Sequence, residues 1–510
     1  MLRLKVIKQL YQTDKNLAIR LINEEEIKPE ETQELYELLN EKDDELLFAI
    51  YSYFNKNPQH LDLKKFSQIT KIPVFVLHKI FTEKPIKVKF PVVNNKEADI
   101  ASAYIFIFNK EIPQNTFFNK EELKIIKRFL KQRNINRNFF VIFDKQFKGK
   151  SYLLAVVAGL ILPEYILEDF AFTGEVNEEG EIYPVGYIKN KKKIADKNNL
   201  NLITYEDIYH IDELIYYLGE EAIDIPFVQL SNKTEEEAYI SLEKLENKIK
   251  EKINFYSLEK LEKFFGISKK DLILTSEYLP KPEKDNNQWI NTIKTFEEKL
   301  KKIYSSIKRK KRILHFSGSI SSLAFGFGIK LGTKKPVIVY HYQADNYHKV
   351  IDLSNEEQIR QIKHIKEKLE NLEIKQLKGN KNAKELAIAI WIAGHNPYGD
   401  VLRFSENKNW EVIGIEAKKF KGNLPLPKKR EYENLWLEIT REIFTVINDM
   451  KNKKYERIHI FLSSPVAISF ASGMAIGHFI NGTVYNINKN DETPYFATFN
   501  IEDKALYSMF

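Results

Sequence analysis

The chain of 510 residues contains no cysteine and only four methionines. Without a thiol it can form no disulfide, no thiolate metal site and no cysteine-nucleophile intermediate. A covalent mechanism in this chain must therefore use an oxygen or an amine as its nucleophile.

Long hydrophobic runs are also missing. The most apolar stretch, LLAVVAGLIL from Leu153, is about half as long as a membrane-spanning helix and is followed by Pro163 and Glu164. The N-terminal segment MLRLKVIKQLYQTDKN has neither the apolar core nor the cleavage site of a secretory signal. We expect a cytoplasmic protein without a membrane segment, in which the Leu153 stretch is a buried helix.

Two further absences concern phosphate and nucleic acid. No G-x-x-x-x-G-K-[ST] loop occurs, so we expect no ATP-driven motor and no cofactor or metal for catalysis. Charge of one sign is not concentrated, since 79 Lys and Arg are interleaved with 71 Asp and Glu to give a net charge of +8. A long surface for duplex DNA is not implied, whereas a local pocket for a small anion is compatible with this pattern.

A chain of this length predicts several folding units, and hydrophobic residues make up 43% of it. We expect a multidomain α/β protein with a helical N-terminal domain at 1–85, a mixed domain at 86–222 and a C-terminal domain at 223–510. In the first domain, KKFSQITKIPVFVLHKIF predicts two helices around a turn at 71–73. This pair is either a DNA-reading helix-turn-helix or, as is commoner, a helical hairpin that packs on its neighbours.

The C-terminal domain contains an internal repeat. HFSGSISSLAFGFGIKLG, from His315 to Gly332, aligns without a gap with IFLSSPVAISFASGMAIG, from Ile460 to Gly477. Each copy predicts a strand, a tight loop, a helix with small residues and a second strand, so we expect two related α/β halves at about 235–380 and 381–510. Such units bind ligands outside the carboxyl ends of their strands. The candidate ligand residues lie in these loops: Gly318, Ser319, Ser463, Ser464 and Pro465.

A catalytic site is indicated upstream of the repeat, where FTGEVNEEGEIYPVGYIKNKKKIADK follows GKSYLLAVVAGLIL. We expect Ser151 in the first turn of the apolar helix, where the helix dipole and free backbone N–H groups favour an oxyanion. A lysine-rich helix begins near Tyr187. A lysine can deprotonate a serine only when burial lowers its pKa enough to leave it neutral. Ile188 and Ala195 mark the inward face of this helix, and Lys191 or Lys192 lies between them.

These segments resemble Lon proteases, which have a G-x-S serine, a TGE turn, a G-x-x-x-P-V/I-G hairpin and a lysine on the next helix. The resemblance implies a Ser/Lys endopeptidase with Ser151 as nucleophile and Lys191 as base, and with Thr173 hydrogen-bonded to the lysine amine. Lon enzymes usually have proline before the serine and Ala-Gly after it, whereas this chain has Lys150, Tyr152 and Leu153. This departure puts the shape of the oxyanion loop in doubt.

The repeated region resembles SAVED domains, which consist of two CARF-like (Rossmann-like) halves and bind cyclic oligonucleotides. The likeness rests on SGSISSLAF, on VIVYHYQ and on IHIFLSSPVAISFASGMAIG with the later NDETPYFATFNI, and it covers about 235–510. Backbone N–H groups and hydroxyls of short Ser/Gly loops suit phosphates. Tyr340, Tyr342 and Tyr485 are candidate covers for bases.

Together the two likenesses resemble the CRISPR-associated Lon proteases with a SAVED domain, antiviral effectors of type III systems. That family implies activation by cyclic tetra-adenylate, ligand-driven oligomerisation, and cleavage of a companion anti-sigma-like protein bound to a sigma-like partner. Two other classes remain open, namely a catalytically inactive nucleotide-sensing scaffold and a DNA-binding regulator that uses the N-terminal helices.

Overall fold

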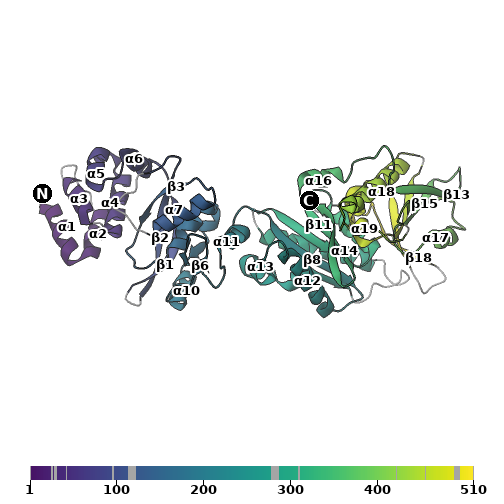
Figure 1. Ribbon diagram of the computed structural model, residues 1–510, viewed down its shortest axis with the longest axis horizontal. Helices are drawn as coiled ribbons and strands as arrows, with labels where there is room; N and C mark the ends of the chain where they lie inside the picture. Colours follow the sequence, from purple (N-terminus) through teal and green to yellow (C-terminus); the bar gives the residue numbers. More distant parts are fainter. Residues whose placement is uncertain are drawn as a thin grey trace. The chain divides into compact units, whose positions relative to one another are not determined.

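The computed structural model describes residues 2–24, 27, 32–41, 43–94, 97–112, 122–276, 287–307, 310–420, 422–453, 455–487 and 494–508. The chain separates into two compact units, Met1–Glu221 and Ala222–Phe510 (Figure 1). Short 3₁₀ turns occur at Leu39–Glu41, Pro58–His60, Lys269–Leu272, Arg430–Tyr432 and Lys504–Leu506.

The first unit begins with a group of helices. They are α1 (Leu2–Thr13), α2 (Lys15–Glu24), α3 (Thr32–Leu38), α4 (Asp44–Lys56), α5 (Leu63–Thr70) and α6 (Val74–Thr82). The turn expected at 71–73 joins α5 to α6, with Lys71 in the left-handed conformation. The helices share one hydrophobic core with Phe106, Phe108, Phe140 and Ile142 of the following sheet. The N-terminal helices are therefore part of the same compact unit as the sheet.

The sheet of this unit has the order β3-β2-β1-β4-β7. Its strands are β1 (Ile86–Asn94), β2 (Glu97–Phe108), β3 (Asn138–Phe143), β4 (Phe170–Phe172) and β7 (Asn201–Ile203), and a separate hairpin consists of β5 (Glu175–Val176) and β6 (Ile182–Tyr183). The remaining helices are α7 (Leu123–Gln132), α8 (Leu153–Ile161), α9 (Glu164–Leu167), α10 (Ile188–Lys197) and α11 (Ile211–Leu218). The apolar stretch from Leu153 is the helix α8, which is buried against β1 and β2.

Two larger sheets form the second unit. The first, in the order β12-β11-β10-β8-β9, consists of β8 (Ile223–Ser231), β9 (Ile273–Ser276), β10 (Arg312–Ser317), β11 (Val337–Gln343) and β12 (Asn346–Leu353). The second, in the order β13-β15-β14-β16-β17-β18, consists of β13 (Leu372–Lys378), β14 (Glu385–Trp391), β15 (Trp410–Ala417), β16 (Arg457–Ser463), β17 (Gly482–Ile487) and β18 (Tyr495–Asn500). The helices are α12 (Glu235–Lys250), α13 (Leu258–Phe265), α14 (Asn287–Ser306), α15 (Ser321–Leu331), α16 (Glu356–Gln361), α17 (Tyr398–Phe404), α18 (Leu435–Lys451) and α19 (Val466–Ile476).

The repeat is visible in the topology. The series β10, α15, β11, β12 has the same pairing directions as β16, α19, β17, β18, with two parallel strands followed by an antiparallel one. The gap-free alignment of the strands is wrong, however. His315, and not its sequence neighbour Phe316, corresponds to His459, because each histidine binds a tyrosine of one neighbouring strand in the sheet and a carboxylate of the other. The second copy therefore has one extra residue between its histidine and the start of its helix.

The two copies meet where α15 crosses α19. A Cβ atom on Gly328 would lie 1.9 Å from the carbonyl oxygen of Phe470, and one on Gly473 would lie 2.0 Å from that of Phe325. Phe316 and Phe470 stack beside this crossing with ring centroids 4.1 Å apart. The glycines thus let the two backbones touch in a pseudo-twofold contact.

We expect Gly473→Ala to lower the free energy of unfolding by about 2–4 kcal/mol, because a methyl group there overlaps the backbone of α15. Gly399→Ala is the matched control, since a Cβ at Gly399 has nothing within 4 Å, and it should change stability by less than ~1 kcal/mol. Urea unfolding measures both variants. Equal stability of the two would contradict the close crossing.

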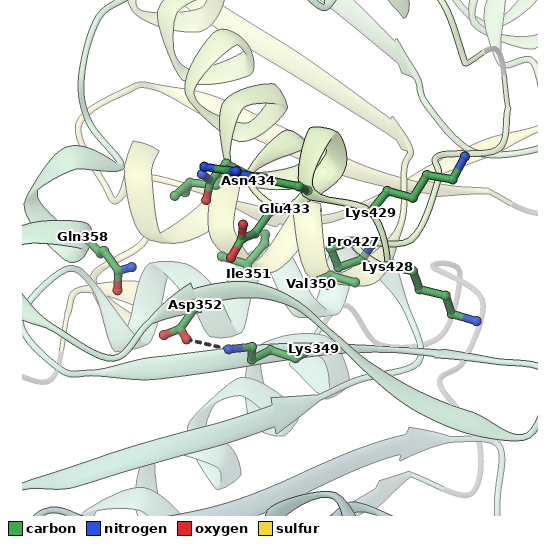
Figure 2. A pocket seen from close by; sticks show the side chains of 12 residues that line it. Lys349, Val350, Ile351, Asp352, Gln358, Pro427, Lys428, Lys429, Glu433 and Asn434 are labelled. Atoms are coloured by element: carbon green, nitrogen blue, oxygen red, sulfur yellow. Dashed lines mark hydrogen bonds and ion pairs between the residues drawn. The ribbon is translucent and has the colours of Figure 1, made fainter. Parts of the chain in front are cut away.

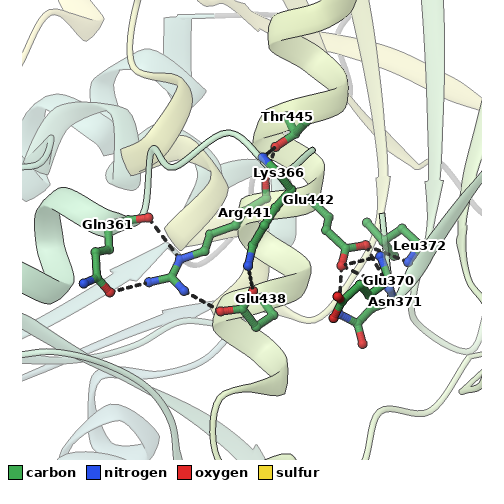
Figure 3. A network of polar contacts seen from close by, with 9 residues as sticks. All are labelled: Gln361, Lys366, Glu370, Asn371, Leu372, Glu438, Arg441, Glu442 and Thr445. Atoms are coloured by element: carbon green, nitrogen blue, oxygen red, sulfur yellow. Dashed lines mark hydrogen bonds and ion pairs between the residues drawn. The ribbon is translucent and has the colours of Figure 1, made fainter. Parts of the chain in front are cut away.

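A polar network holds the segment that joins the two halves against α18 (Figure 3). The buried carboxylate of Glu442 on α18 accepts hydrogen bonds from the backbone N–H groups of Glu370, Asn371 and Leu372 at 2.8–3.0 Å. The residue before it, Arg441, donates to the carbonyl oxygen of Gln361 at 3.0 Å. The middle of α18 therefore fixes the connection between α16 and β13.

Candidate functional site

The lysine-rich helix α10 buries one lysine. Lys191 is 4% exposed, whereas Lys189, Lys192 and Lys193 are exposed. One turn later on the same face, Ala195 belongs to a small core with Ala171 of β4. The packing of this face against the sheet places the Lys191 amine inside the protein.

With the described part of the chain, the Lys191 amine forms one hydrogen bond. Its Nζ donates to Thr173 Oγ1 at 3.0 Å, and Thr173 is fully buried directly after β4. Thr173 is itself fixed, because its backbone N–H donates to the carbonyl oxygen of Ile203 at 2.9 Å. Burial lowers the pKa of the Lys191 amine from 10.5 to about 8, so the neutral form of a base is accessible near neutral pH.

Ser151 lies in the turn that leads into α8. The helix begins at Leu153 with Tyr152 as its N-cap, so the expectation that Ser151 occupies the first helical turn is wrong. Tyr152 takes the N-cap position because its ring is buried among Phe90, Phe143 and Phe147. Sequence alone could not show this cluster, since Phe90 comes from β1, far along the chain from the stretch that contains Phe143, Phe147 and Tyr152.

Backbone bonds tie the Ser151 turn to the TGE segment. The N–H of Gly174 donates to the carbonyl oxygen of Ser151 at 2.9 Å, and the N–H of Leu154 donates to that of Gly174 at 3.1 Å. An ion pair of 3.1 Å joins Lys150 to Glu175 across the same junction. Ser151, Thr173 and Lys191 therefore belong to adjoining segments, the first two connected through Gly174 and the last two by a direct hydrogen bond.

A second candidate site is a cavity of about 510 Å³ in the second unit, at the carboxyl ends of β8, β10 and β11. We call it the sensor cavity; it is lined by Leu230, Ser231, Lys233, Glu237, Ile240, Ser241, Lys244, Ser317, Gly318, Ser319, Tyr340, His341, Tyr342, Tyr347 and Val466. Gly318 and Ser319 are thus at the cavity, together with Tyr340 and Tyr342. Lys233 and Lys244 also line the cavity, where Lys233 is ion-paired with Glu237 at 2.6 Å and Lys244 with Asp345. The sequence analysis did not select these two lysines.

The loop of the second copy is used differently. Ser463 and Ser464 are buried, with hydroxyl groups that bond to the carbonyl oxygen of His395 and to Ser469 at 2.6 Å, respectively. Pro465 is the N-cap of α19, and the adjacent Val466 lines the sensor cavity. Ser321 donates to the carbonyl oxygen of Ser464 at 2.7 Å. The two loops therefore lie together, and the second contributes the apolar side chain of Val466 to the cavity wall.

Each half also contains a buried carboxylate–histidine–tyrosine chain that the sequence analysis missed. His315 lies 2.6 Å from Asp224 and 3.0 Å from the hydroxyl of Tyr340. His459 lies 2.7 Å from Glu385 and 3.0 Å from the hydroxyl of Tyr485. Tyr340 lines the sensor cavity, whereas Tyr485 belongs to a hydrophobic core. The recurrence of histidine before each loop was the signal, and the gap-free alignment concealed it.

Residues 296–501 match the sequence profile of the SAVED family, the SMODS-associated and fused to various effectors sensor domain. This segment is a SAVED domain. The matched residues begin within α14, so β8 and β9 pair into a sheet of the SAVED domain although they precede the match. The SAVED resemblance is confirmed for this range, which is shorter than the 235–510 expected.

Comparison with solved structures gives distant similarities to Cap4 SAVED/CARF-domain containing receptors. The Moraxella osloensis receptor shares 11% identity over 47% of this chain, with a TM-score of 0.27, and the chain covers 46% of that receptor. The Acinetobacter baumannii receptor with the cyclic trinucleotide 2'3'3'-cAAA shares 12% identity over 82% of this chain and 94% of that chain, with a TM-score of 0.37. Its structure with 3'3'3'-cAAA gives 10% identity and a TM-score of 0.36 at the same coverage. No curated protein matches the chain.

Neither a metal-binding cluster nor a membrane-spanning helix occurs among the described residues. These residues contain no group of three or more His, Asp or Glu side chains placed to hold a metal ion. None of the helices described there has the length and apolar character needed to cross a bilayer.

Proposed function

We propose that this protein is a serine endopeptidase controlled by a cyclic oligonucleotide. The first unit would hydrolyse a peptide bond with Ser151 and Lys191, and the SAVED domain would bind the activating ligand. The observation that carries the proposal is the buried Lys191 amine, which has a lowered pKa, a single hydroxyl partner and a position on segments joined to the Ser151 turn. A buried cation without a carboxylate is costly to fold, and such costs are characteristic of active sites.

The chemistry follows from these groups. The Ser151 hydroxyl attacks the peptide carbonyl carbon while its proton passes to the neutral Lys191 amine. The resulting ammonium returns that proton to the leaving amine as the C–N bond breaks, which leaves an acyl ester on Ser151. A water molecule, deprotonated by the same amine, then hydrolyses the ester. Thr173 orients the amine throughout through its hydrogen bond.

The ligand site of this proposal is the sensor cavity. It is surrounded by the loop Ser317–Ser319, the amines of Lys233 and Lys244, and the rings of Tyr340 and Tyr342, a combination that suits phosphates and bases. The N–H and hydroxyl of Ser319 donate to Gln229 at 3.1 and 3.4 Å, so a phosphate bound there would replace these hydrogen bonds. Cyclic tetra-adenylate is the proposed ligand. Part of a ring bound here would remain accessible to a second copy of the chain, which would account for ligand-driven self-association.

The activating ligand and the substrate are tested together. Cyclic tri-, tetra- and hexa-adenylates are compared by thermal shift, by sedimentation and by cleavage of the proposed substrate, an anti-sigma-like companion protein. We expect the tetra-adenylate to stabilise the chain, to increase its mass and to start cleavage without ATP. A liganded, fully active monomer would contradict the assembly step, and cleavage that is insensitive to every ring would contradict ligand control.

Charge reversal in the sensor cavity provides a sharper test. Lys233→Glu combined with Lys244→Glu should weaken binding of the activating ring at least tenfold, because two cations that face phosphates become anions. Lys368→Glu is the control, since this exposed lysine of the same unit lies outside the cavity. Isothermal titration measures all three proteins. Unchanged affinity in the double variant would place the ligand elsewhere.

A further inference from the structure

The turn between β11 and β12 has an acidic residue close to the sensor cavity. Gln343 pairs with Asn346, so Ala344 and Asp345 are the two residues of the turn. Both have a positive φ, 50° and 60° respectively, which is the left-handed conformation that a two-residue hairpin turn of this type requires. The turn therefore holds Asp345 at the end of the strand that bears Tyr342 of the cavity.

The Asp345 carboxylate binds two residues that line the sensor cavity. Its Oδ1 atom lies 2.5 Å from Lys244 Nζ and accepts a hydrogen bond of 2.6 Å from the Tyr342 hydroxyl. The Lys244 amine also donates to that hydroxyl at 3.1 Å. Lys244 and Tyr342 line the cavity, whereas Asp345 lies outside its lining. The carboxylate thus neutralises a cation of the cavity from its edge.

The other lysine of the cavity has an acidic partner with a structural role. Lys233 pairs with Glu237 at 2.6 Å, and the Glu237 carboxylate also accepts hydrogen bonds from the backbone N–H and the hydroxyl of Thr234 at 2.9 and 3.3 Å, in the capping box of α12. Glu237 therefore stabilises the start of that helix. Within the described part of the chain, the Asp345 carboxylate hydrogen-bonds only to the two cavity residues.

The ion pair of Asp345 and Lys244 is exposed enough to be exchanged for a ligand. The Asp345 side chain is 80% exposed and that of Lys244 is 34% exposed. Such pairs contribute little stability, because water solvates both charges when they separate. A phosphate that binds Lys244 must nevertheless displace the carboxylate and then remain near its negative charge, and this repulsion lowers the affinity.

We propose that Asp345 is an internal competitor of the ligand in the sensor cavity and determines which phosphate compounds bind there. This inference rests on the proposed nucleotide-binding function of the cavity. The competition weakens every ligand that places a phosphate on Lys244. A mononucleotide has few other contacts and is excluded, whereas a cyclic oligonucleotide has further phosphates and bases that maintain its binding. Asp345 is thus a specificity-determining residue that acts against the smaller ligands.

Asp345→Asn tests the proposal in the full-length protein, because asparagine keeps the size of the side chain and an oxygen for Tyr342 but has no charge. Isothermal titration with cyclic tetra-adenylate at low salt should give an affinity about three- to tenfold higher than that of the parent protein, and AMP should gain by a similar factor. The gain should disappear at about 1 M salt, where charges are screened. Unchanged or weaker binding at low salt would overturn the proposal, and weaker binding would show that the carboxylate positions Lys244 for the ligand.

Asp352→Asn is the matched control. Asp352 lies on β12, the strand that follows Asp345, and pairs with Lys349 at 2.9 Å (Figure 2). Both residues line a different cavity, which shares no lining residue with the sensor cavity. This variant makes the same chemical change and should leave the affinity for the ring within about twofold of the parent value. An equal gain in both variants would show a general effect of net charge and would overturn the assignment to Asp345.

Failure of the proposed function would give a different result. If the ring binds outside the sensor cavity, the variant with both Lys233→Glu and Lys244→Glu will bind it as the parent does, and both proposals are overturned. If that double variant loses the ring but Asp345→Asn binds it with the parent affinity, the cavity remains the ligand site and only the role of Asp345 is rejected.

Discussion

Replacing Ser151 with alanine, or Lys191 with methionine, is expected to reduce peptide-bond cleavage by a factor on the order of 10⁴ or more. Each change removes one member of a nucleophile–base pair, and the remaining member has no partner with which to perform the proton transfer. Methionine is chosen because it retains the length and packing of the buried Lys191 side chain but has no amine. The rate of substrate cleavage in the presence of the activating ring measures the effect.

Lys192→Met is the matched control for this experiment. Lys192 is exposed on the same helix, one residue from the buried lysine, so its replacement should leave the rate within about twofold of the parent protein. Inactivity of Lys192→Met with retained activity of Lys191→Met would show that the other lysine of the helix is the base. Retained cleavage by Ser151→Ala would exclude the proposed nucleophile, and the scaffold hypothesis would then gain support.

The free energy of unfolding distinguishes a variant that has lost only its catalytic activity from one that has lost its fold. Burial of the Lys191 amine stabilises its neutral form, so the charged form that prevails at pH 7 opposes folding. Lys191→Met should therefore raise the free energy of unfolding at pH 7 by about 1–3 kcal/mol while it abolishes activity. A destabilised Lys191→Met protein would show that the amine contributes to the fold and would weaken its assignment as a base.

Local patterns in the sequence were sufficient for several features of the fold. The helical hairpin of α5 and α6, the buried helix α8 and the strand–loop–helix–strand repeat each depend on periodicity within a short window. The spacing of Ile188 and Ala195 along one helix likewise limited the inward lysine to Lys191 or Lys192, and the resemblance to Lon proteases selected Lys191. Such features are encoded by neighbours in sequence, and the structure has them where they were expected.

Features that depend on distant contacts could not be predicted. The aromatic cluster around Tyr152 moves the start of α8 past Ser151, and it adds Phe90 of the distant strand β1 to the nearby Phe143 and Phe147. The use of Ser463 and Ser464 in internal hydrogen bonds depends on His395 and Ser469, which no local rule selects. The loops after β10 and β16 have unequal roles, and only their contacts in the folded chain show this difference.

The histidine chains explain why the gap-free alignment of the two copies was wrong in the first strand. His315 and His459 occupy equivalent positions, but one extra residue follows in the second copy. A gap-free alignment that pairs Gly328 with Gly473, the glycines at the helix crossing, necessarily shifts β10 by one residue relative to β16. The helices were matched correctly because close backbone contact fixes their glycines, whereas the strand residues were paired by chemical similarity alone.

Cleavage should also depend steeply on pH, in a direction that the Lys191 environment determines. The base acts only when neutral, and its pKa is lowered to about 8. The rate should therefore rise roughly tenfold for each pH unit below about 8 and become constant above it. An independent measurement is the stability difference between the parent and Lys191→Met. Because the unfolded chain binds the extra proton between pH 8 and 10.5, the parent should gain free energy of unfolding relative to the variant as pH rises through that window.

Thr173→Val tests whether the hydrogen-bonded pair of Lys191 and Thr173 determines this pH dependence. Valine keeps the shape of the buried side chain but removes the Oγ1 atom that lies 3.0 Å from the lysine amine. The charged amine then loses its one hydrogen-bond acceptor among the described residues, which should move the midpoint of the rate profile to lower pH and reduce the plateau rate because the amine is less well oriented. Ser102→Ala serves as the control, since this buried hydroxyl of β2 is absent from the hydrogen bonds of the site. A rate that falls as pH rises toward 8, or a midpoint that stays fixed in Thr173→Val, would show that a group other than Lys191 controls the reaction.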